Sequence, residues 1–434
     1  MMSYMFYMIF VIPLFNYSFW YCYQFIYMFF IFIFMFSPSE FNLCSFSYLF
    51  GVDYISYSLI ILSFYIVSLM NLASLMLMNN SYFLFINYTI CFLLLIIFSS
   101  VNMLLMYISF EFILIPLMIL ILGWGYQPER LRSGIYLFFY TLFGSLPLFI
   151  FILYLYMDFN MICFVFDLNL NFNFIAHLSV IIPFLIKFPM FMLHFWLPKA
   201  HVQAPISGSM ILAGLMLKIG GYGLIRFMYL NEDFFYKYSY IWFSFGILGS
   251  LMVSLICLIQ VDLKCLIAYS SVAHMSLCLM GILTMSKLGM FGSLIMMLSH
   301  GLCSSGLFCL ANICYVRINS RSLYLIKGMI FFMPSMSIFW FLFSSFNMGC
   351  PPSINFLGEL MIIMSSIYYF DLSYYYLFLG SFFCACFCFY LYSCSQHGSF
   401  SDSFSYSNIF ASEFLLLINH LYPLVLLLFW FIIF

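Results

Sequence analysis

The sequence has very little charge. Only 12 Lys and Arg residues and 13 Asp and Glu residues occur in 434, which is 6% of the chain, and the net charge is −1. Soluble domains carry about 25% charged residues. A chain that is 67% apolar cannot hide so much apolar surface from water in a soluble fold. This composition excludes a water-soluble enzyme, a secreted module and a disordered chain, and the lack of a basic region excludes a nucleic-acid binder. A multi-pass membrane protein remains.

Motifs for redox cofactors and nucleotides are also missing. The 15 cysteines include no C-x-x-C pair, and neither G-x-G-x-x-G nor G-x-x-x-x-G-K-[ST] occurs. We therefore expect no cofactor and no metal in this chain, and we interpret Cys384, Cys386 and Cys388 as small packing residues. The first ten residues lack a basic n-region and an Arg-rich stretch, so we expect no signal or transit peptide. The 61 Phe and 35 Tyr favour synthesis from a thymine-rich organelle genome.

Long uncharged runs are present instead, and they predict helices. Residues 54–110, 133–157 and 328–358 contain no Asp, Glu, Lys or Arg. A bilayer core of about 30 Å requires about 20 apolar residues per helix, whereas barrel strands are alternating segments of about 10 residues. We expect an all-α membrane protein with about 14 transmembrane helices. The apolar segments are 5–20, 22–37, 54–77, 83–100, 101–122, 133–157, 176–197, 206–229, 239–259, 263–283, 288–314, 328–346, 353–370, 373–394 and 413–433.

We interpret two of these regions as interrupted helices. Segments 328–346 and 353–370 are separated by Asn347–Pro352, and we interpret them as two halves of one discontinuous helix. Segment 176–197 contains Pro183 and Pro189 and is followed directly by Pro198, so we interpret it as a second discontinuous helix. Interrupted helices in both halves of a chain are typical of transporters built from inverted repeats.

The loop cations predict the orientation of the chain. Alternate loops form two sets, and the set with more cations is expected on the inside, which is the matrix or the cytoplasm. The inner set is Arg130, Arg132, Lys199, Lys264, Arg317, Arg321 and Lys327, and the outer set is Arg226, Lys237 and Lys287.

Six titratable residues lie in the middle of apolar spans. A charge at a helix centre costs roughly 2.5–3.5 kcal/mol, so such residues face the protein interior and mark an ion or proton path by default. Burial favours the neutral forms of lysine and glutamate, whereas an opposite charge nearby favours the charged forms, so these groups can exchange protons. The six are Glu111, Lys187, Lys218, His274, His300 and Glu359.

Each of the six also has a structural interpretation. Glu111 and Lys187 can form a static buried ion pair, and Lys218 can bind the carbonyls of a broken helix. A histidine in the middle of a helix can be a satisfied core residue. Gly220, Gly221 and Gly223 after Lys218 allow close helix packing with no further role.

At these residues the sequence resembles the chain 4 family of NADH–ubiquinone oxidoreductase, the antiporter-like membrane subunits of mitochondrial respiratory complex I. The resemblance is specific from about residue 100 to 360. The matching stretches are Phe110–Pro116, Leu122–Arg130, Tyr140–Pro147, Lys187–Pro189, Leu193–Pro205, Leu217–Gly223, Asp262–His274, His300–Asn312 and Pro351–Glu359.

The resemblance implies two inverted five-helix repeats, at 83–229 and 239–394, between N-terminal helices in 1–82 and a loop with a last helix in 395–434. It implies that Glu111 pairs with Lys187, that Lys218 is the central proton carrier, that His274 and His300 continue a hydrated axis, and that Glu359 ends it. The related chains 2 and 5 usually carry lysine at the last position, so Glu359 favours chain 4. His194 and His201 are second-tier proton donors near the inner entrance.

Three positions depart from the family pattern. Gln203 stands where His-Val-Glu-Ala-Pro is common, Val316 where Tyr-Glu-Arg is common, and Ile259 where many animal chains have arginine. These departures concern salt bridges at the inner face.

We therefore expect a proton-translocating subunit of complex I in the mitochondrial inner membrane. Its partners would be the other membrane subunits, notably chains 2 and 5, and lipid. NADH, FMN, iron–sulfur clusters and ubiquinone would belong to the rest of the complex. Three alternatives stay open: a subunit of a multisubunit cation/proton antiporter, a structural scaffold of the membrane arm, and a quinone-site subunit, which no sequence feature supports.

Overall fold

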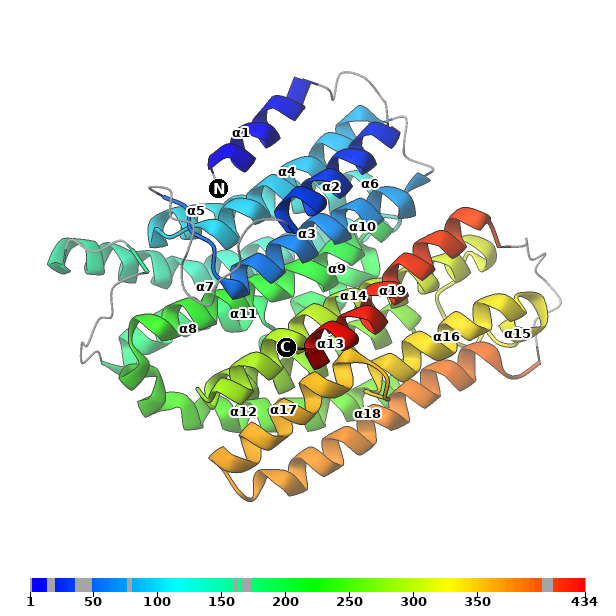
Figure 1. Ribbon diagram of the computed structural model, residues 1–434. Coiled ribbons are helices and arrows are strands. Elements are labelled where there is room, and N and C mark those ends of the chain that lie inside the picture. The colour runs from blue at the N-terminus through cyan, green and yellow to red at the C-terminus, as the bar shows by residue number, and fades with distance from the viewer. Residues whose placement is uncertain are drawn as a thin grey trace. The chain divides into compact units, whose positions relative to one another are not determined.

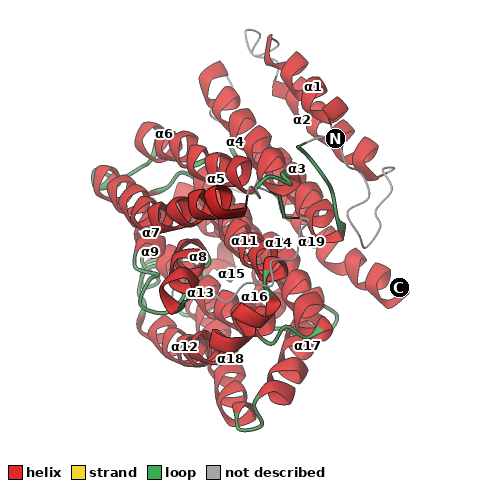
Figure 2. Ribbon diagram, turned by 90° about the vertical axis from the view of Figure 1, so that its left-hand side faces the viewer, coloured by secondary structure: helices red, strands yellow, loops and turns green. Residues whose placement is uncertain are grey.

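A computed structural model describes residues 2–13, 20–35, 49–75, 80–159, 163–164, 173–399 and 409–433. These residues form helices and loops, with three isolated bridges between extended segments (Figure 2). Within these described ranges, ten helices are long and apolar enough to cross a membrane, and four shorter apolar helices accompany them. The prediction of an all-α membrane protein is confirmed. The predicted segments 5–20, 22–37 and 54–77 lie partly outside the described residues. Residues 400–408 of the predicted region 395–434 also lie outside them.

The chain divides into two compact units. The first comprises Met1–Phe188, Gln203–Ile211 and Leu215–Tyr238, and the second comprises Pro189–Val202, Leu212–Gly214 and Ser239–Phe434. We describe each unit by itself. The assignment of residues 83–229 and 239–394 to inverted repeats stays a prediction.

Most helices of the first unit come from the N-terminal half of the chain. Helices α2, α3 and α4 pack in sequence, and α8 packs against α7 and α11 (Figure 1). The helices are α1 (Met2–Val11), α2 (Trp20–Met35), α3 (Tyr54–Ala73), α4 (Ser81–Ser99), α5 (Met103–Phe112), α6 (Leu114–Trp124), α7 (Arg130–Phe159), α8 (Phe174–Lys187), α10 (Ile206–Ile211) and α11 (Leu217–Leu230).

The second unit is built around α14, which packs against α13, α16, α17 and α19 (Figure 1). Helix α12 (Glu232–Ile259) passes from the first unit into the second at Ser239. The other helices are α9 (Trp196–Gln203), α13 (Leu263–Leu283), α14 (Lys287–Ile318), α15 (Met329–Phe332), α16 (Pro334–Asn347), α17 (Ile354–Tyr369), α18 (Ser373–Gln396) and α19 (Ala411–Ile433).

Two spans each contain a stretch that is entirely buried. The most apolar windows of Ile206–Leu230 and of Lys287–Ile318 are both 100% buried, whereas that of Ser373–Gln396 is 28% buried. A helical stretch without lipid-facing surface can carry polar side chains, because protein or water rather than hydrocarbon surrounds them. Lys218 lies on the first of these spans and His300 on the second.

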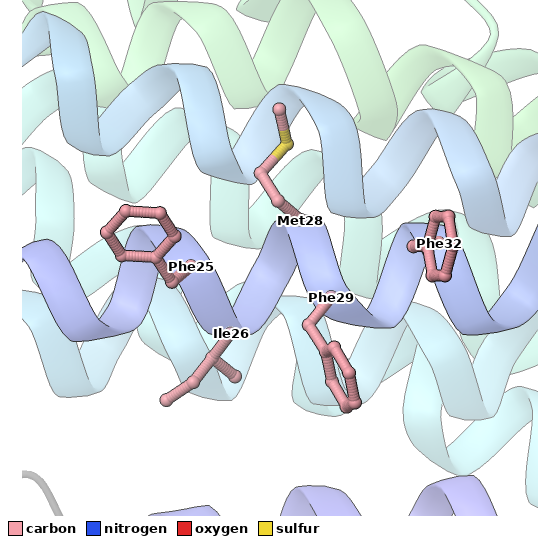
Figure 3. A pocket seen from close by; sticks show the side chains of 5 residues that line it. All are labelled: Phe25, Ile26, Met28, Phe29 and Phe32. Atoms are coloured by element: carbon pink, nitrogen blue, oxygen red, sulfur yellow. The ribbon is translucent and has the colours of Figure 1, made fainter.

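The outer face of α2 shows the opposite character. Phe25, Ile26, Met28, Phe29 and Phe32 line a shallow apolar depression, and all five side chains come from this single helix (Figure 3). Phe25 is 73% exposed and Phe29 is 62% exposed. The residues that line the depression are all apolar, so it is a surface for lipid or protein and not a site for chemistry.

Both predicted helix interruptions are present. Helix α8 ends at Lys187, and α9 begins only at Trp196. Helix α16 ends at Asn347, and α17 begins at Ile354 after the two prolines. Two further interruptions were not predicted: α5 and α6 are separated at Ile113, and Leu212–Met216 form a π-helical turn between α10 and α11.

Candidate functional site

In the first unit, the ammonium group of Lys187 lies where two helices are interrupted. Pro189 disfavours the helical conformation for Phe188, so α8 ends at Lys187. Pro116 of α6 has no N–H to donate to the carbonyl of Phe112, four residues earlier in α5, and the helix is interrupted at Ile113. Each interruption releases backbone groups from their helical partners and makes them available to side chains.

Lys187 binds one of these released groups. Its Nζ donates to the carbonyl of Phe110 at 2.7 Å and lies 2.9 Å from the centre of the Phe110 ring. Lys187 is only 1% exposed. A backbone carbonyl and an aromatic face both stabilise a cation, but neither carries a formal negative charge.

Glu111 follows Phe110 directly, and both of its carboxylate oxygens are buried. Neither oxygen accepts a hydrogen bond from the described residues. Glu111 and Lys187 form no ion pair within 4.0 Å in this part of the chain, because the ammonium group lies on the carbonyl of Phe110. The carboxylate of Glu111, which accepts no hydrogen bond from the described residues, therefore follows directly after the residue that binds the ammonium group of Lys187.

Helix α11 brings Lys218 to the same region of the first unit. Lys218 is fully buried and follows the π-helical turn by two residues; such turns occur frequently at functional sites. Two glycines allow α11 to approach α8. A Cβ at Gly220 would lie 2.6 Å from the backbone nitrogen of Phe188, and a Cβ at Gly223 would overlap the ring of Phe184.

In the second unit, His274, His300 and Glu359 come together from α13, α14 and α17. The Nδ1 atom of His274 lies 3.6 Å from Oε1 of Glu359, and the rings of His274 and His300 are 5.7 Å apart at their centres. Both histidines are 1% exposed. Two buried histidines and the partly buried carboxylate of Glu359 therefore lie close together, and their role in proton transfer stays a prediction.

The interruption between α16 and α17 makes room for Glu359. Gly349 has a φ of +77°, and a Cβ there would overlap the carboxylate of Glu359. The amide of Asn355 donates to the carbonyl of Phe346 at 2.7 Å and closes the loop. A cavity of about 30 Å³ adjoins Glu359 and Ser381, which is room for one or two waters.

Cys384 was not predicted to contact this cluster. Its Sγ lies 3.8 Å from Nε2 of His274 and 4.0 Å from the carbonyl of Asn347. The imidazole of His274 therefore lies between a carboxylate and a thiol. No sequence signal indicates this contact, because Cys384 and His274 are 110 residues apart.

The second-tier histidines belong to the second unit and are also buried. His194 is 2% exposed and stacks on Phe195 with ring centres 4.8 Å apart. His201 is fully buried and lies parallel to the ring of Phe308 at 4.8 Å. These ring contacts join the two histidines to phenylalanines and not to the cluster around His274, so their role as proton donors stays a prediction.

The three departures from the family pattern lie in different environments. Gln203 donates weakly to Glu129 at 3.5 Å, in the first unit. Ile259 is 78% exposed and Val316 is 57% exposed. The two apolar residues therefore lie on the surface, where they cost little and form no salt bridge.

Two arginines that the charge count placed in loops are instead buried in helices. Arg226 lies in α11, where it pairs with Asp53, and Arg317 lies in α14, where it binds Glu413 at 2.6 and 3.1 Å. Each arginine is 8% exposed. The prediction was wrong for both because a charged residue near the end of an apolar run resembles a loop residue unless its distant partner is known.

Among the described residues, no group of three or more His, Cys, Asp or Glu side chains could hold a metal ion.

Comparison with known proteins identifies the family. Residues 1–99 match the model for the amino terminus of NADH-ubiquinone oxidoreductase chain 4, and residues 100–388 match the model for NADH:quinone oxidoreductase/Mrp antiporter transmembrane proteins. The NADH-ubiquinone oxidoreductase chain 4 of Ceratitis capitata is 49% identical over 387 residues, which are 88% of this chain and 87% of the relative. That of Locusta migratoria is 46% identical over 435 residues, 98% of each chain.

The chain belongs to the NADH–ubiquinone oxidoreductase chain 4 family. It is a proton-translocating membrane subunit of respiratory complex I and a multi-pass protein of the mitochondrial inner membrane. The chain 4 relatives place the chain in complex I and not among the subunits of a multisubunit antiporter. Membership in complex I also implies that other subunits of the complex are its partners.

The fold agrees with this family. A chain of respiratory complex I from Thermus thermophilus, solved with bound NADH, superposes with a TM-score of 0.84 at 21% identity, covering 92% of this chain and 88% of that one.

Proposed function

We propose that protons move through two buried clusters, one in each unit. The first cluster consists of Glu111, Lys187 and Lys218, and the second consists of His274, His300 and Glu359. Electron transfer elsewhere in the complex would drive the movement, and this chain would hold no redox cofactor of its own. NADH, FMN, iron–sulfur clusters and ubiquinone would bind to other subunits.

The observation that carries this proposal is the environment of Glu111. A buried carboxylate without hydrogen-bond partners is costly, and a static structural role would select a paired or an apolar residue instead. The cost is removed when the carboxylate takes a proton, binds water or receives the ammonium group of Lys187. Lys187, bound to a neutral carbonyl 2.7 Å away, can move between that carbonyl and the carboxylate.

The cost of moving a proton against the membrane potential requires a driven relay. Moving one charge against 100 mV costs about 2.3 kcal/mol, so a passive path would run in the wrong direction. A lysine whose partner alternates between a carboxylate and a carbonyl changes its hold on a proton with each exchange. The cluster around His274 supplies further side chains of the types that exchange protons.

The test uses the assembled complex with Glu111→Gln and Lys218→Ala. Both variants should suppress NADH-driven proton pumping and coupled quinone reduction while the subunit remains assembled, because each removes a titratable group and leaves the helix intact. Glu413→Gln is the matched control, since Glu413 pairs with Arg317 outside both clusters. Normal pumping by both cluster variants would refute the proposed sites and would favour a scaffold in which buried charges only fix the packing.

We further propose that the antiporter-like chains 2 and 5 are direct neighbours. The family resemblance supports this proposal. Cross-linking between this chain and chains 2 and 5 in the intact complex tests it, and exclusive cross-links to other subunits would contradict it.

A further inference from the structure

A second buried charged network lies in the first unit, outside the proposed clusters. Arg226 of α11 pairs with Asp53, the residue before α3, and its Nε donates to the hydroxyl of Tyr222 at 2.8 Å. The Tyr222 hydroxyl donates in turn to the carbonyl of Phe98 at 2.9 Å. Tyr222 is 1% exposed, and the rings of Tyr222 and Phe98 meet edge to face at 5.2 Å.

This network closes one end of the unit. It joins the beginning of α3, the end of α4 and the last two turns of α11. At the same end, the backbone of Gly51 donates to the carbonyl of Ser99 at 2.7 Å. These contacts fix the three helix termini to one another around the guanidinium group.

The network also lies in line with Lys218. Lys218, Tyr222 and Arg226 are spaced four residues apart, so they occupy one face of α11. Arg226 is about 12 Å beyond Lys218 along the helix axis. A proton that left Lys218 along this face would reach Tyr222 and then the guanidinium before it reached the carboxylate of Asp53.

The hydrogen bonds within the network do not conduct protons. A hydroxyl group relays a proton only if two conditions hold. Its oxygen must accept an incoming proton, and its own hydrogen must pass to a second acceptor that can in turn release a proton. The Tyr222 hydroxyl already accepts from Arg226, and its hydrogen is held by the carbonyl of Phe98, where a transfer chain ends. The guanidinium has only donors and does not lose its proton in proteins.

We propose that Arg226, held in place by Tyr222 and Asp53, is a barrier that stops protons on Lys218 from leaking past the end of the unit where α3 begins and α4 ends. A fixed guanidinium excludes protons and cations from membrane pores by the same physical effect. This inference rests on the proposed function of Lys218. It adds a residue that blocks protons to a set of residues that move them.

The experiment measures passive proton flux, without turnover. Complex I carrying Arg226→Met or Asp53→Asn is reconstituted into liposomes, a potassium diffusion potential is imposed with valinomycin, and proton entry is followed with a pH dye in the absence of NADH. Both variants break the same ion pair, but only Arg226→Met removes the positive charge. Arg317→Met, which breaks the Arg317–Glu413 pair in the second unit, is the matched control.

We expect Arg226→Met to raise the passive flux by at least about tenfold, because a fixed cation within several ångströms repels an excess proton strongly at a low effective dielectric constant. Asp53→Asn keeps the cation and an acceptor oxygen, so its flux should equal that of the unmodified complex. Arg317→Met should also remain tight. Unchanged flux in Arg226→Met, or equal leaks in Arg226→Met and Asp53→Asn, would overturn the proposal.

Assembly is checked on native gels before each measurement. If Arg226→Met does not assemble, the double variant Asp53→Asn/Arg226→Met leaves no unpaired buried charge and should leak to the same extent. A tight double variant would overturn the proposal. The outcome is independent of Glu111→Gln and Lys218→Ala, since those variants report on pumping and these report on leakage.

Discussion

The close contact between α11 and α8 makes Gly220 the most sensitive position for the geometry of the first cluster. A methyl group at Gly220 would lie 2.6 Å from the backbone nitrogen of Phe188 and 2.8 Å from its Cβ. Phe188 follows Lys187 directly, so any displacement of this segment moves the ammonium group. Gly220→Ala therefore perturbs the cluster without changing any titratable residue.

The size of the displacement follows from the contact. Backbone atoms cannot give way as a flexible side chain does, and restoring an ordinary contact distance requires α11 and Phe188 to separate by about 0.8 Å. Overpacking of this kind costs roughly 1–3 kcal/mol. Replacing glycine by alanine within a helix returns up to about 1 kcal/mol. We expect a small loss of stability and a large loss of function, since a misplacement of about 1 Å can reduce a rate by about 100-fold.

The assay compares NADH-driven proton pumping and thermal unfolding for Gly220→Ala and Gly123→Ala. Gly123 lies in α6 of the same unit, and a Cβ added there would meet no atom within 4 Å, so alanine fits without strain. Gly123→Ala should pump normally and be unchanged or slightly more stable. Gly220→Ala should pump at roughly 1–10% of the control rate. Equal pumping by the two variants would show that the spacing of α8 and α11 does not set the rate.

Two further predictions concern the second unit. Glu413→Gln removes the negative charge that pairs with Arg317 and should lower the free energy of unfolding by about 2 kcal/mol while pumping is retained. Thermal release of the subunit measures the stability, and proton uptake measures the pumping. Unchanged stability would show that the ion pair contributes nothing. Gly349→Ala forces a residue at a φ of +77° against the carboxylate of Glu359 and should reduce pumping at least about tenfold with the complex assembled; a normal proton-to-electron ratio and rate would contradict it.

The helical architecture could be predicted from the sequence because lipid leaves the backbone few options. Only helices and closed barrels pair every backbone group inside a bilayer, so long uncharged runs predict helices. The interruptions beside Pro189 and Pro351 could be predicted for a related reason, since proline removes a donor and disfavours the helical conformation of the preceding residue. Pro116 indicates the interruption at Ile113 in the same way. We did not predict this interruption, because the apolar segment 101–122 is otherwise uniform.

The partners of the buried charges could not be predicted from the sequence. Lys187 binds a carbonyl 77 residues away, and Arg226 binds a carboxylate 173 residues away. No local pattern records such pairs, because they depend on which helices become neighbours. One signal did exist for Arg226: it lies within the apolar segment 206–229, eight residues after Lys218, and therefore on the same face of α11.

The buried charges differ in how completely their hydrogen bonds are satisfied, and this difference separates the two arginines from the residues that we propose to move protons. The guanidiniums of Arg226 and Arg317 each have a carboxylate and a further oxygen acceptor, so their charges are compensated in one arrangement. Among the described residues, Glu111 has no partner for either oxygen. A charge whose hydrogen bonds are all satisfied is not stabilised further when it binds a proton or changes its partner. An unsatisfied buried charge is stabilised by either change, because the free-energy penalty of its desolvation is then relieved. We therefore expect the carboxylate of Glu111, which follows the Phe110 carbonyl that binds Lys187, to respond to a change in its surroundings more than the two arginines do.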